Sequence, residues 1–167
     1  MSGFTIQRDY PHPPELVWRA LTTPELLARW LMPNDFQPTV GHEFTFTTDP
    51  GPGFDGVIRC RVLEIDPPKT MSFTWVGGPI DTVVRFQLRP TDAGTHLQMS
   101  QHGFKGLRAR LVGQMLRIGC RRIYGRNLPN VLNELAGRDA ARFDDGCMSV
   151  TQSIIIRLIR LFRRSNK

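Results

Sequence analysis

The stretch TVVRFQLRPTDAGTHLQMSQ, residues 82–101, decides the fold, because apolar and polar residues alternate on both sides of a turn sequence. Alternation with a period of two is typical of a strand with one buried and one solvated face. The central TDAG, residues 91–94, is rich in residues that favour tight turns. Because so short a connection joins antiparallel neighbours, the stretch predicts a β-hairpin.

The same period extends the hairpin into a sheet. Further strands are predicted over residues 44–47, 57–65 and 71–76, separated by segments rich in Gly, Pro and Asp. Residues 4–8 add a first strand. We expect a curved antiparallel meander of six strands, or of seven if the segment around residue 54 breaks in two.

Two short helices are predicted after the first strand. Pro14 suits the first turn of a helix, and residues 15–21 carry apolar side chains at helical spacing. Thr23 is placed to cap a second helix, whose apolar face over residues 26–31 ends before Pro33. The strand, the two helices and the meander indicate an α+β protein.

The period becomes helical again after the last strand. It predicts one helix over residues 106–124 and a second over residues 129–136, ended by Gly137. We expect two helices because Pro129 belongs in a first turn or at a kink. Together these elements describe a helix-grip fold, in which a curved sheet wraps around a C-terminal helix.

The chain divides into a domain over residues 1–137, a polar linker over residues 138–148 and a helical tail over residues 149–167. In the tail, apolar residues project to one side at about 100° per residue and arginines project to the other. Such a basic amphipathic helix suits an anionic membrane surface or a groove on a partner protein. Folding back on its own domain, or covering a second copy in a homodimer, is the simpler alternative. The residues expected to make the membrane or partner contact are Arg157, Arg160, Phe162, Arg163 and Arg164.

Composition limits the function classes. The net charge of +7 is segregated, since residues 1–102 hold 8 Lys/Arg against 11 Asp/Glu and the remainder holds 14 against 4. The basic segments lack interleaved stacking aromatics, so nucleic-acid binding is not expected. No apolar run approaches the roughly 18 residues that cross a bilayer, and no export signal is evident. We expect a cytoplasmic protein, peripheral at the membrane if the tail binds there.

The sequence offers little for cofactor or metal chemistry. Cys60, Cys120 and Cys147 lie too far apart for a zinc motif, and their odd number does not favour a disulfide framework. No phosphate-binding glycine loop or nucleophile elbow is present. His96 and His102 share a strand face, but they lie six positions apart, too far to bind one metal as neighbours. We therefore expect no metal and no cofactor, and assign no catalytic residue.

Three segments carry a resemblance to a known family. Residues 12–30, HPPELVWRALTTPELLARW, closely resemble the opening of the family named for the activator of heat shock protein 90 ATPase, in the START-like (SRPBCC, Bet-v-like) superfamily. VLEIDPPK at 62–69, leading to Phe73 to Trp75, and residues 94–104 are similar to its central hairpin and last strand. The resemblance covers residues 3–104. Where the family usually has Gly-Trp, this chain has Asn-Leu-Pro at 127–129.

The resemblance implies a cavity between the sheet and the C-terminal helix, which would hold a small hydrophobic or amphipathic ligand for carriage, sensing or sequestration. It also leaves open a chaperone-modulating module, or an enzyme of the cyclase or hydrolase type. Aromatic and aliphatic walls suit such a cavity, although the same side chains could simply fill a core. The expected ligand-binding residues are Trp30, Phe46, Trp75, Phe86, Met99, Phe104, Leu107, Leu111 and Met115.

Arginines on the strands have two interpretations. Arg59, Arg61 and Arg85 fall where side chains of the convex, solvated face are expected. An inward arginine would instead hold a ligand carboxylate in bidentate fashion.

Overall fold

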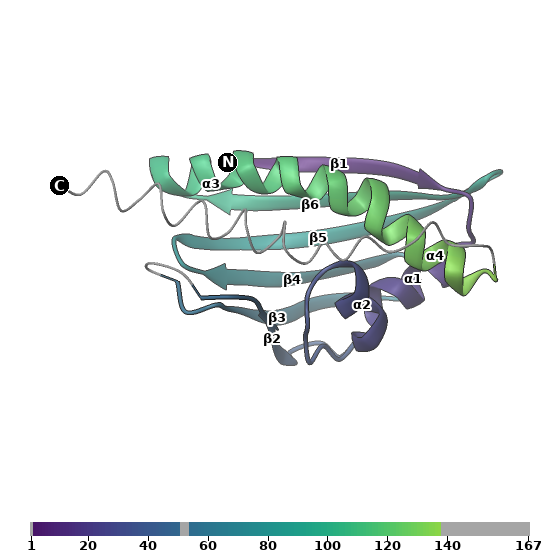
Figure 1. Ribbon diagram of the computed structural model, residues 1–167, viewed down its shortest axis with the longest axis horizontal. Coiled ribbons are helices and arrows are strands. Elements are labelled where there is room, and N and C mark those ends of the chain that lie inside the picture. Colours follow the sequence, from purple (N-terminus) through teal and green to yellow (C-terminus); the bar gives the residue numbers. More distant parts are fainter. Residues whose placement is uncertain (1, 51–53, 138–167) are drawn as a thin grey trace.

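The computed structural model describes residues 2–50 and 54–137, so the predicted linker and tail lie outside the described residues. The predicted α+β helix-grip fold is confirmed: a curved antiparallel sheet carries a long C-terminal helix and two short helices (Figure 1). Its elements are β1 (Ser2–Tyr10), α1 (Pro14–Thr22), α2 (Pro24–Trp30), β2 (Glu43–Thr47), β3 (Val57–Asp66), β4 (Thr70–Gly77), β5 (Ile80–Thr91), β6 (Gly94–Phe104), α3 (Gly106–Arg122), η1 (Ile123–Asn127) and α4 (Leu128–Leu135).

The sheet forms as the alternation predicts. In the described residues it has six strands in the order β1-β6-β5-β4-β3-β2, and every neighbouring pair is antiparallel. In the central hairpin Phe86 pairs with Met99, and both side chains are buried. Gly94 in its turn has φ +143°, and a Cβ there would lie 2.1 Å from the Tyr10 carbonyl oxygen. Only glycine lets this turn approach the end of β1 so closely.

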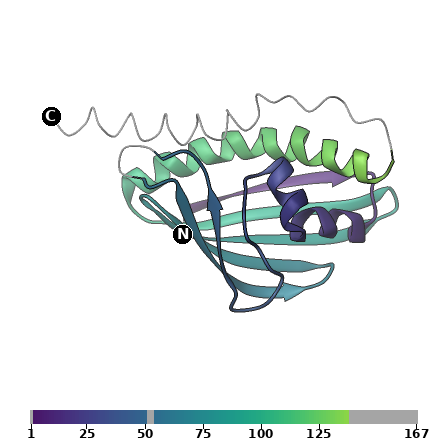
Figure 2. The same ribbon diagram turned by 60° about the horizontal axis from the view of Figure 1, so that its bottom comes forward.

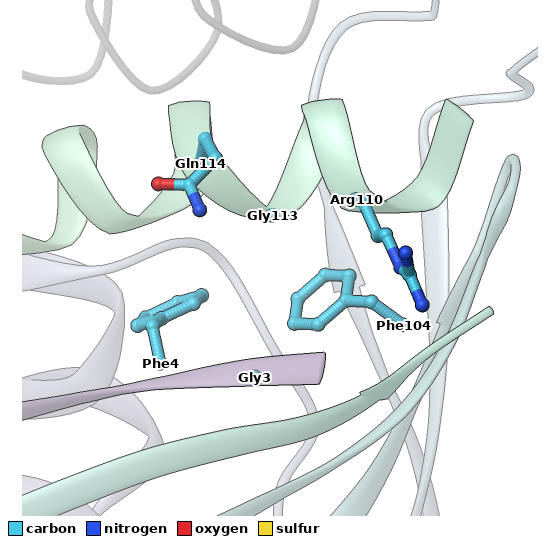
Figure 3. Close-up of a pocket in the computed structure, with 6 residues that line it drawn as sticks. All are labelled: Gly3, Phe4, Phe104, Arg110, Gly113 and Gln114. Carbon is cyan, nitrogen blue, oxygen red and sulfur yellow. The ribbon is translucent and has the colours of Figure 1, made fainter. Parts of the chain in front are cut away.

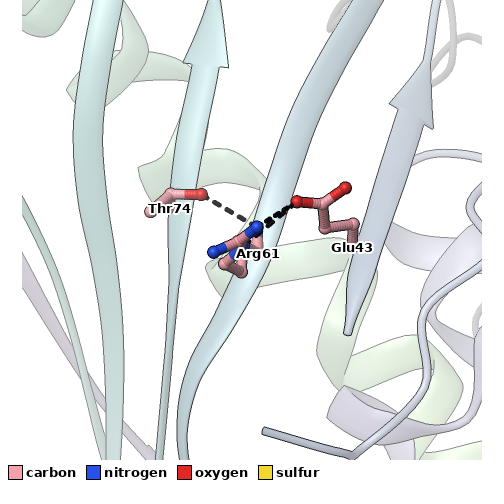
Figure 4. Close-up of polar contacts among 3 residues, drawn as sticks. All are labelled: Glu43, Arg61 and Thr74. Atoms are coloured by element: carbon pink, nitrogen blue, oxygen red, sulfur yellow. Dashed lines mark hydrogen bonds and ion pairs between the residues drawn. The ribbon is translucent and has the colours of Figure 1, made fainter. Parts of the chain in front are cut away.

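The convex face of the sheet carries the arginines, as predicted. Arg59, Arg61 and Arg85 are all exposed, and each guanidinium forms an ion pair with an acidic side chain. Figure 4 shows Arg61 paired with Glu43 across the β2–β3 ladder, while its backbone N–H donates to the Thr74 hydroxyl at 2.8 Å. Exposed ion pairs of this kind contribute little to the free energy of unfolding. We therefore assign these arginines to the solvated face of the sheet and not to a ligand site.

The short helices lie on the same side of the sheet as the long helix (Figure 2). Each begins with a proline, which costs nothing in a first turn because that N–H has no helical acceptor. Trp30 at the end of α2 is buried, and its indole N–H donates to the Ala20 carbonyl at 2.9 Å. Asn127 Nδ2 donates to the Trp30 carbonyl at 3.3 Å. The C-terminal helix thereby holds α2 in place.

The C-terminal helix departs from prediction, because the two expected helices are joined. A five-residue π-helical segment, η1, links α3 to α4 without a break. Within it the Leu128 N–H bonds to the Ile123 carbonyl, five residues back. The next residue in that series is Pro129, which has no N–H to give to the Tyr124 carbonyl. The Tyr10 hydroxyl donates to that carbonyl at 2.6 Å, in the buried interior.

This hydrogen bond explains how a proline is tolerated inside a long helix. A buried carbonyl without a donor is costly, and Tyr10 supplies the donor from the end of β1. Burial raises the pKa of the Tyr10 phenol well above its usual range, so the hydroxyl keeps its proton. Tyr10, 114 positions before Tyr124 in the sequence, thus completes the hydrogen bonding of the π-helical turn.

We predict that Tyr10→Phe lowers the free energy of unfolding by about 1–3 kcal/mol, because the Tyr124 carbonyl loses its donor. Pro129→Ala supplies a backbone N–H, so the cost of Tyr10→Phe should shrink by at least about 0.5 kcal/mol in that background. Urea unfolding of the four proteins measures both effects. Additive costs would show that Tyr10 and Pro129 are not coupled through this carbonyl.

Candidate functional site

An aromatic cluster fills the space between the sheet and the helices. Trp30 lies against Tyr124, with ring centroids 5.4 Å apart, and Tyr124 lies against Phe86 at 6.1 Å. Phe46 continues the cluster toward the sheet edge and contacts Trp75 at 5.2 Å. Close aromatic packing of this kind gives the interior a rigid apolar wall.

The structure places most of the predicted ligand-binding residues in this interior. Trp30, Phe46, Phe86 and Met99 are buried, with at most 2% of each side chain's surface exposed. Trp75 and Met115 are half-buried and pack against the same core. All of these residues therefore serve the hydrophobic core, and their contact with a ligand stays a prediction.

A pocket of about 220 Å³ lies at the end of the molecule where β1 and α3 both begin (Figure 3). Phe104, one of the predicted residues, lines it. Its other lining residues come from β1 and α3, and were not among those expected from the sequence: Gly3, Phe4, Arg110, Gly113 and Gln114.

The pocket combines an apolar wall with a polar rim. Phe4 and Phe104 are buried and stack with centroids 6.0 Å apart and an interplanar angle of 30°. Arg110 and Gln114 are exposed and lie one helical turn apart on α3, on the helix side of the two rings (Figure 3). A guanidinium donates two parallel hydrogen bonds to a carboxylate or phosphate, and an amide adds a further donor.

Arg110 differs from the arginines of the convex face in its surroundings. Those on the convex face pair with acidic side chains, whereas no ion pair is formed by Arg110 within residues 2–50 and 54–137. The sequence holds no Asp or Glu between Asp92 and Glu134. The positive charge at the pocket rim is therefore not neutralised by its own helix.

Small side chains bring α3 close to the sheet. The buried positions of α3 are Ala109, Val112, Gly113 and Gly119. A Cβ at Gly113 would lie 3.1 Å from the Phe104 ring, tighter than ordinary contact. Close approach at this point sets the depth of the pocket.

Two of the expected ligand-binding residues, Leu107 and Leu111, lie elsewhere on the same helix. Leu107 and Leu111 are 75% and 54% exposed, and neither lines the pocket. Arg110 comes one residue before Leu111, and Gln114 comes one residue before Met115. Each polar side chain therefore lies about 100° around the helix from the apolar side chain that follows it. The sequence analysis placed Leu107, Leu111 and Met115 at the ligand site, whereas Leu107 and Leu111 point outward and the fully buried positions of α3 are mostly small.

The buried ionisable groups are poorly suited to nucleophilic chemistry. Burial raises the pKa of the Cys120 thiol to about 12 and that of the Cys60 thiol further. The Tyr124 phenol is likewise shifted upward in pKa by burial. No group of three His, Cys, Asp or Glu side chains comes together as metal ligands in the described part of the chain. No helix there is long and apolar enough to cross a membrane.

Comparison with known proteins decides the family. Residues 11–133 match the family described as Activator of Hsp90 ATPase homolog 1-like protein. The chain belongs to this family. The match spans both short helices, the five strands from β2 to β6, and most of the C-terminal helix, so the family's pattern includes the α3 side of the pocket.

Several solved structures are similar to this Activator of Hsp90 ATPase homolog 1-like chain. MLL2253 from Mesorhizobium loti is 38% identical, with a TM-score of 0.72 over 80% of this chain and 98% of that one. BH1534 from Bacillus halodurans is 23% identical, with a TM-score of 0.67 over 79% and 97%. CalU16 from Micromonospora echinospora is 19% identical, with a TM-score of 0.61 over 94% and 87%. The last two show the fold alone, and no curated protein matches the chain.

We predict that Gly113→Val destabilises the protein by about 1–3 kcal/mol through overpacking against Phe104. The matched control is Gly125→Val, because a Cβ at Gly125 has only Arg8 side-chain atoms near it, at 3.7 Å. Urea unfolding measures both variants. Equal destabilisation would mean that the cost comes from the valine in the helix and that Gly113 does not limit the approach of α3.

Proposed function

We propose that the protein binds a small amphipathic ligand in the pocket between α3 and the β1–β6 end of the sheet. The ligand would place an apolar or aromatic body on Phe4 and Phe104 and an anionic group on Arg110. The observation that carries the proposal is an arginine without an acidic partner at the rim of an apolar pocket. Gln114 would add an amide hydrogen bond that orients the ligand.

The family supports this proposal at the level of fold. Its helix-grip architecture places the last helix across the sheet, and pockets of few polar and many apolar groups are typical ligand sites. DynU16, from the dynemicin biosynthetic locus, shares the fold at 21% identity with a TM-score of 0.64, and this chain covers 49% of that chain. We propose carriage, sensing or sequestration of the ligand, and assign no catalytic role to the pocket residues.

We also propose, from the sequence, that the ligand site extends from the pocket into the interior between sheet and helices. Trp30, Trp75, Phe46, Phe86 and Met99 would form apolar walls if a longer ligand extended from the pocket into the interior. The tail, residues 149–167, would contact an anionic membrane, a protein groove or a second copy, and lies outside the described residues. We propose a cytoplasmic location for the protein, which suits both the ligand pocket and the contact made by the tail.

The test uses 1-anilinonaphthalene-8-sulfonate, a fluorescent probe with an aromatic body and a sulfonate. We expect Arg110→Gln to weaken its binding to the full chain about tenfold or more, because a hydrogen bond to a charged group contributes about 1.5–3 kcal/mol. Gly113→Val should weaken it by filling the pocket. Arg89→Gln, on an exposed position of β5, removes the same charge and is the control.

Fluorescence titration at fixed protein concentration gives the dissociation constants. The proposal fails if Arg110→Gln and Gly113→Val both bind the probe as the unmodified protein does. If both variants weaken binding, native mass spectrometry of gently purified protein would identify the natural ligand as an added mass on the folded chain.

A further inference from the structure

The outward side of α3 carries an apolar stripe that the pocket does not use. Leu107, Leu111 and Ile118 are 75%, 54% and 67% exposed. Their steps of four and seven residues place all three side chains within about 40° of one another around the helix. We call these three residues the outer stripe.

The outer stripe lies opposite the buried side of the same helix. Ala109, Val112 and Gly113 face the sheet, and they sit about 140–240° around the helix from Leu107. Three large apolar side chains thus face solvent, while the fully buried positions of α3 are mostly small. Burial in this domain cannot explain the outer stripe, because the core side of α3 is already occupied.

Arginines flank the outer stripe on both sides. At 100° per residue, Arg110, Arg117 and Arg121 lie along one border and Arg108 and Arg122 along the other. Residues 105–126 hold seven Lys/Arg and no Asp/Glu. An apolar strip bordered by cations is the pattern of a helix that lies in the interface of an anionic bilayer.

Charge decides between the possible occupants. A second copy of α3 would bring arginine rows against arginine rows, and residues 149–167 also lack any Asp or Glu. Both would be repelled along the borders of the stripe. Nucleic acid would leave the leucines uncovered and would find no aromatic side chain on the outer face for stacking. An anionic lipid surface would cover the apolar side chains of the outer stripe and also pair its phosphates with the flanking arginines.

We propose that the outward face of α3 binds the surface of anionic phospholipid bilayers. The helix forms the outer layer over β1 and β6, so its 17 residues can lie flat on a plane along about 25 Å (Figure 2). Leu107, Leu111 and Ile118 insert at the boundary between headgroups and acyl chains. The flanking arginines lie at the level of the phosphates.

The test is cosedimentation of the full chain with vesicles of phosphatidylglycerol and phosphatidylcholine in equal parts, at low ionic strength. We expect binding to these vesicles and little binding to pure phosphatidylcholine. The combined variant Leu107→Gln, Leu111→Gln and Ile118→Gln should lower the partition coefficient at least about tenfold. Leu63→Gln with Val83→Gln, at exposed apolar positions on the sheet, should leave it within about twofold.

A second pair of variants tests the charge. Arg117→Gln with Arg121→Gln should weaken binding by about 10- to 30-fold, whereas Arg19→Gln with Arg89→Gln, elsewhere on the surface, removes equal charge with a smaller effect. These variants leave Arg110 unchanged, so the result is independent of the ligand pocket.

Two outcomes would overturn the proposal: the full chain does not bind the anionic vesicles, or the outer-stripe variant binds them as well as the unmodified protein does. In the first case, binding to polyglutamate would assign the face to an acidic protein instead.

Discussion

The hydrogen bond from the Tyr10 hydroxyl to the Tyr124 carbonyl joins the first strand to the last helix, and much of the structure depends on it. It satisfies the one carbonyl that Pro129 leaves open in the π-helical turn, so the chain can pass from α3 into α4 without breaking. The unbroken helix reaches α1 and α2 with α4, where His12 and Asn133 are joined by a 3.0 Å hydrogen bond. The same helix therefore covers β1 at one end and holds both short helices at the other.

Close packing of α3 on the sheet is the second constraint. Gly113 lets α3 approach Phe104, and the pocket lies beside this contact at the beginning of β1. Small side chains occupy the point of closest approach, Leu107 and Leu111 lie on the outer face, and Leu116 packs against the core. The same helix thus carries both an inward ligand site with Arg110 at its rim and an outward apolar stripe.

Prediction from the sequence was correct where a local pattern is compatible with only one kind of structure. Alternation over residues 82–101 is such a pattern, since the buried set of Phe86, Leu88, Leu97 and Met99 suits only a sheet with one covered face. It failed on α3, where helical spacing was correct but the inward direction was assigned to the largest apolar residues. Arg110 and Gln114 carried a recoverable signal, because their spacing of four places them on one face beside a glycine.

By itself the sequence determined the strands, the order of the meander, the two proline-initiated helices and the family, because these depend on local periodicity, turn chemistry and short motifs. Tertiary structure alone decided which face of α3 is buried, that Phe4 and Phe104 stack at the pocket, and that Tyr10 supports a proline-containing helix 114 residues away. The physical reason is that these features rest on close contacts between distant segments. Side-chain size and backbone geometry, rather than hydropathy, decide whether such contacts form.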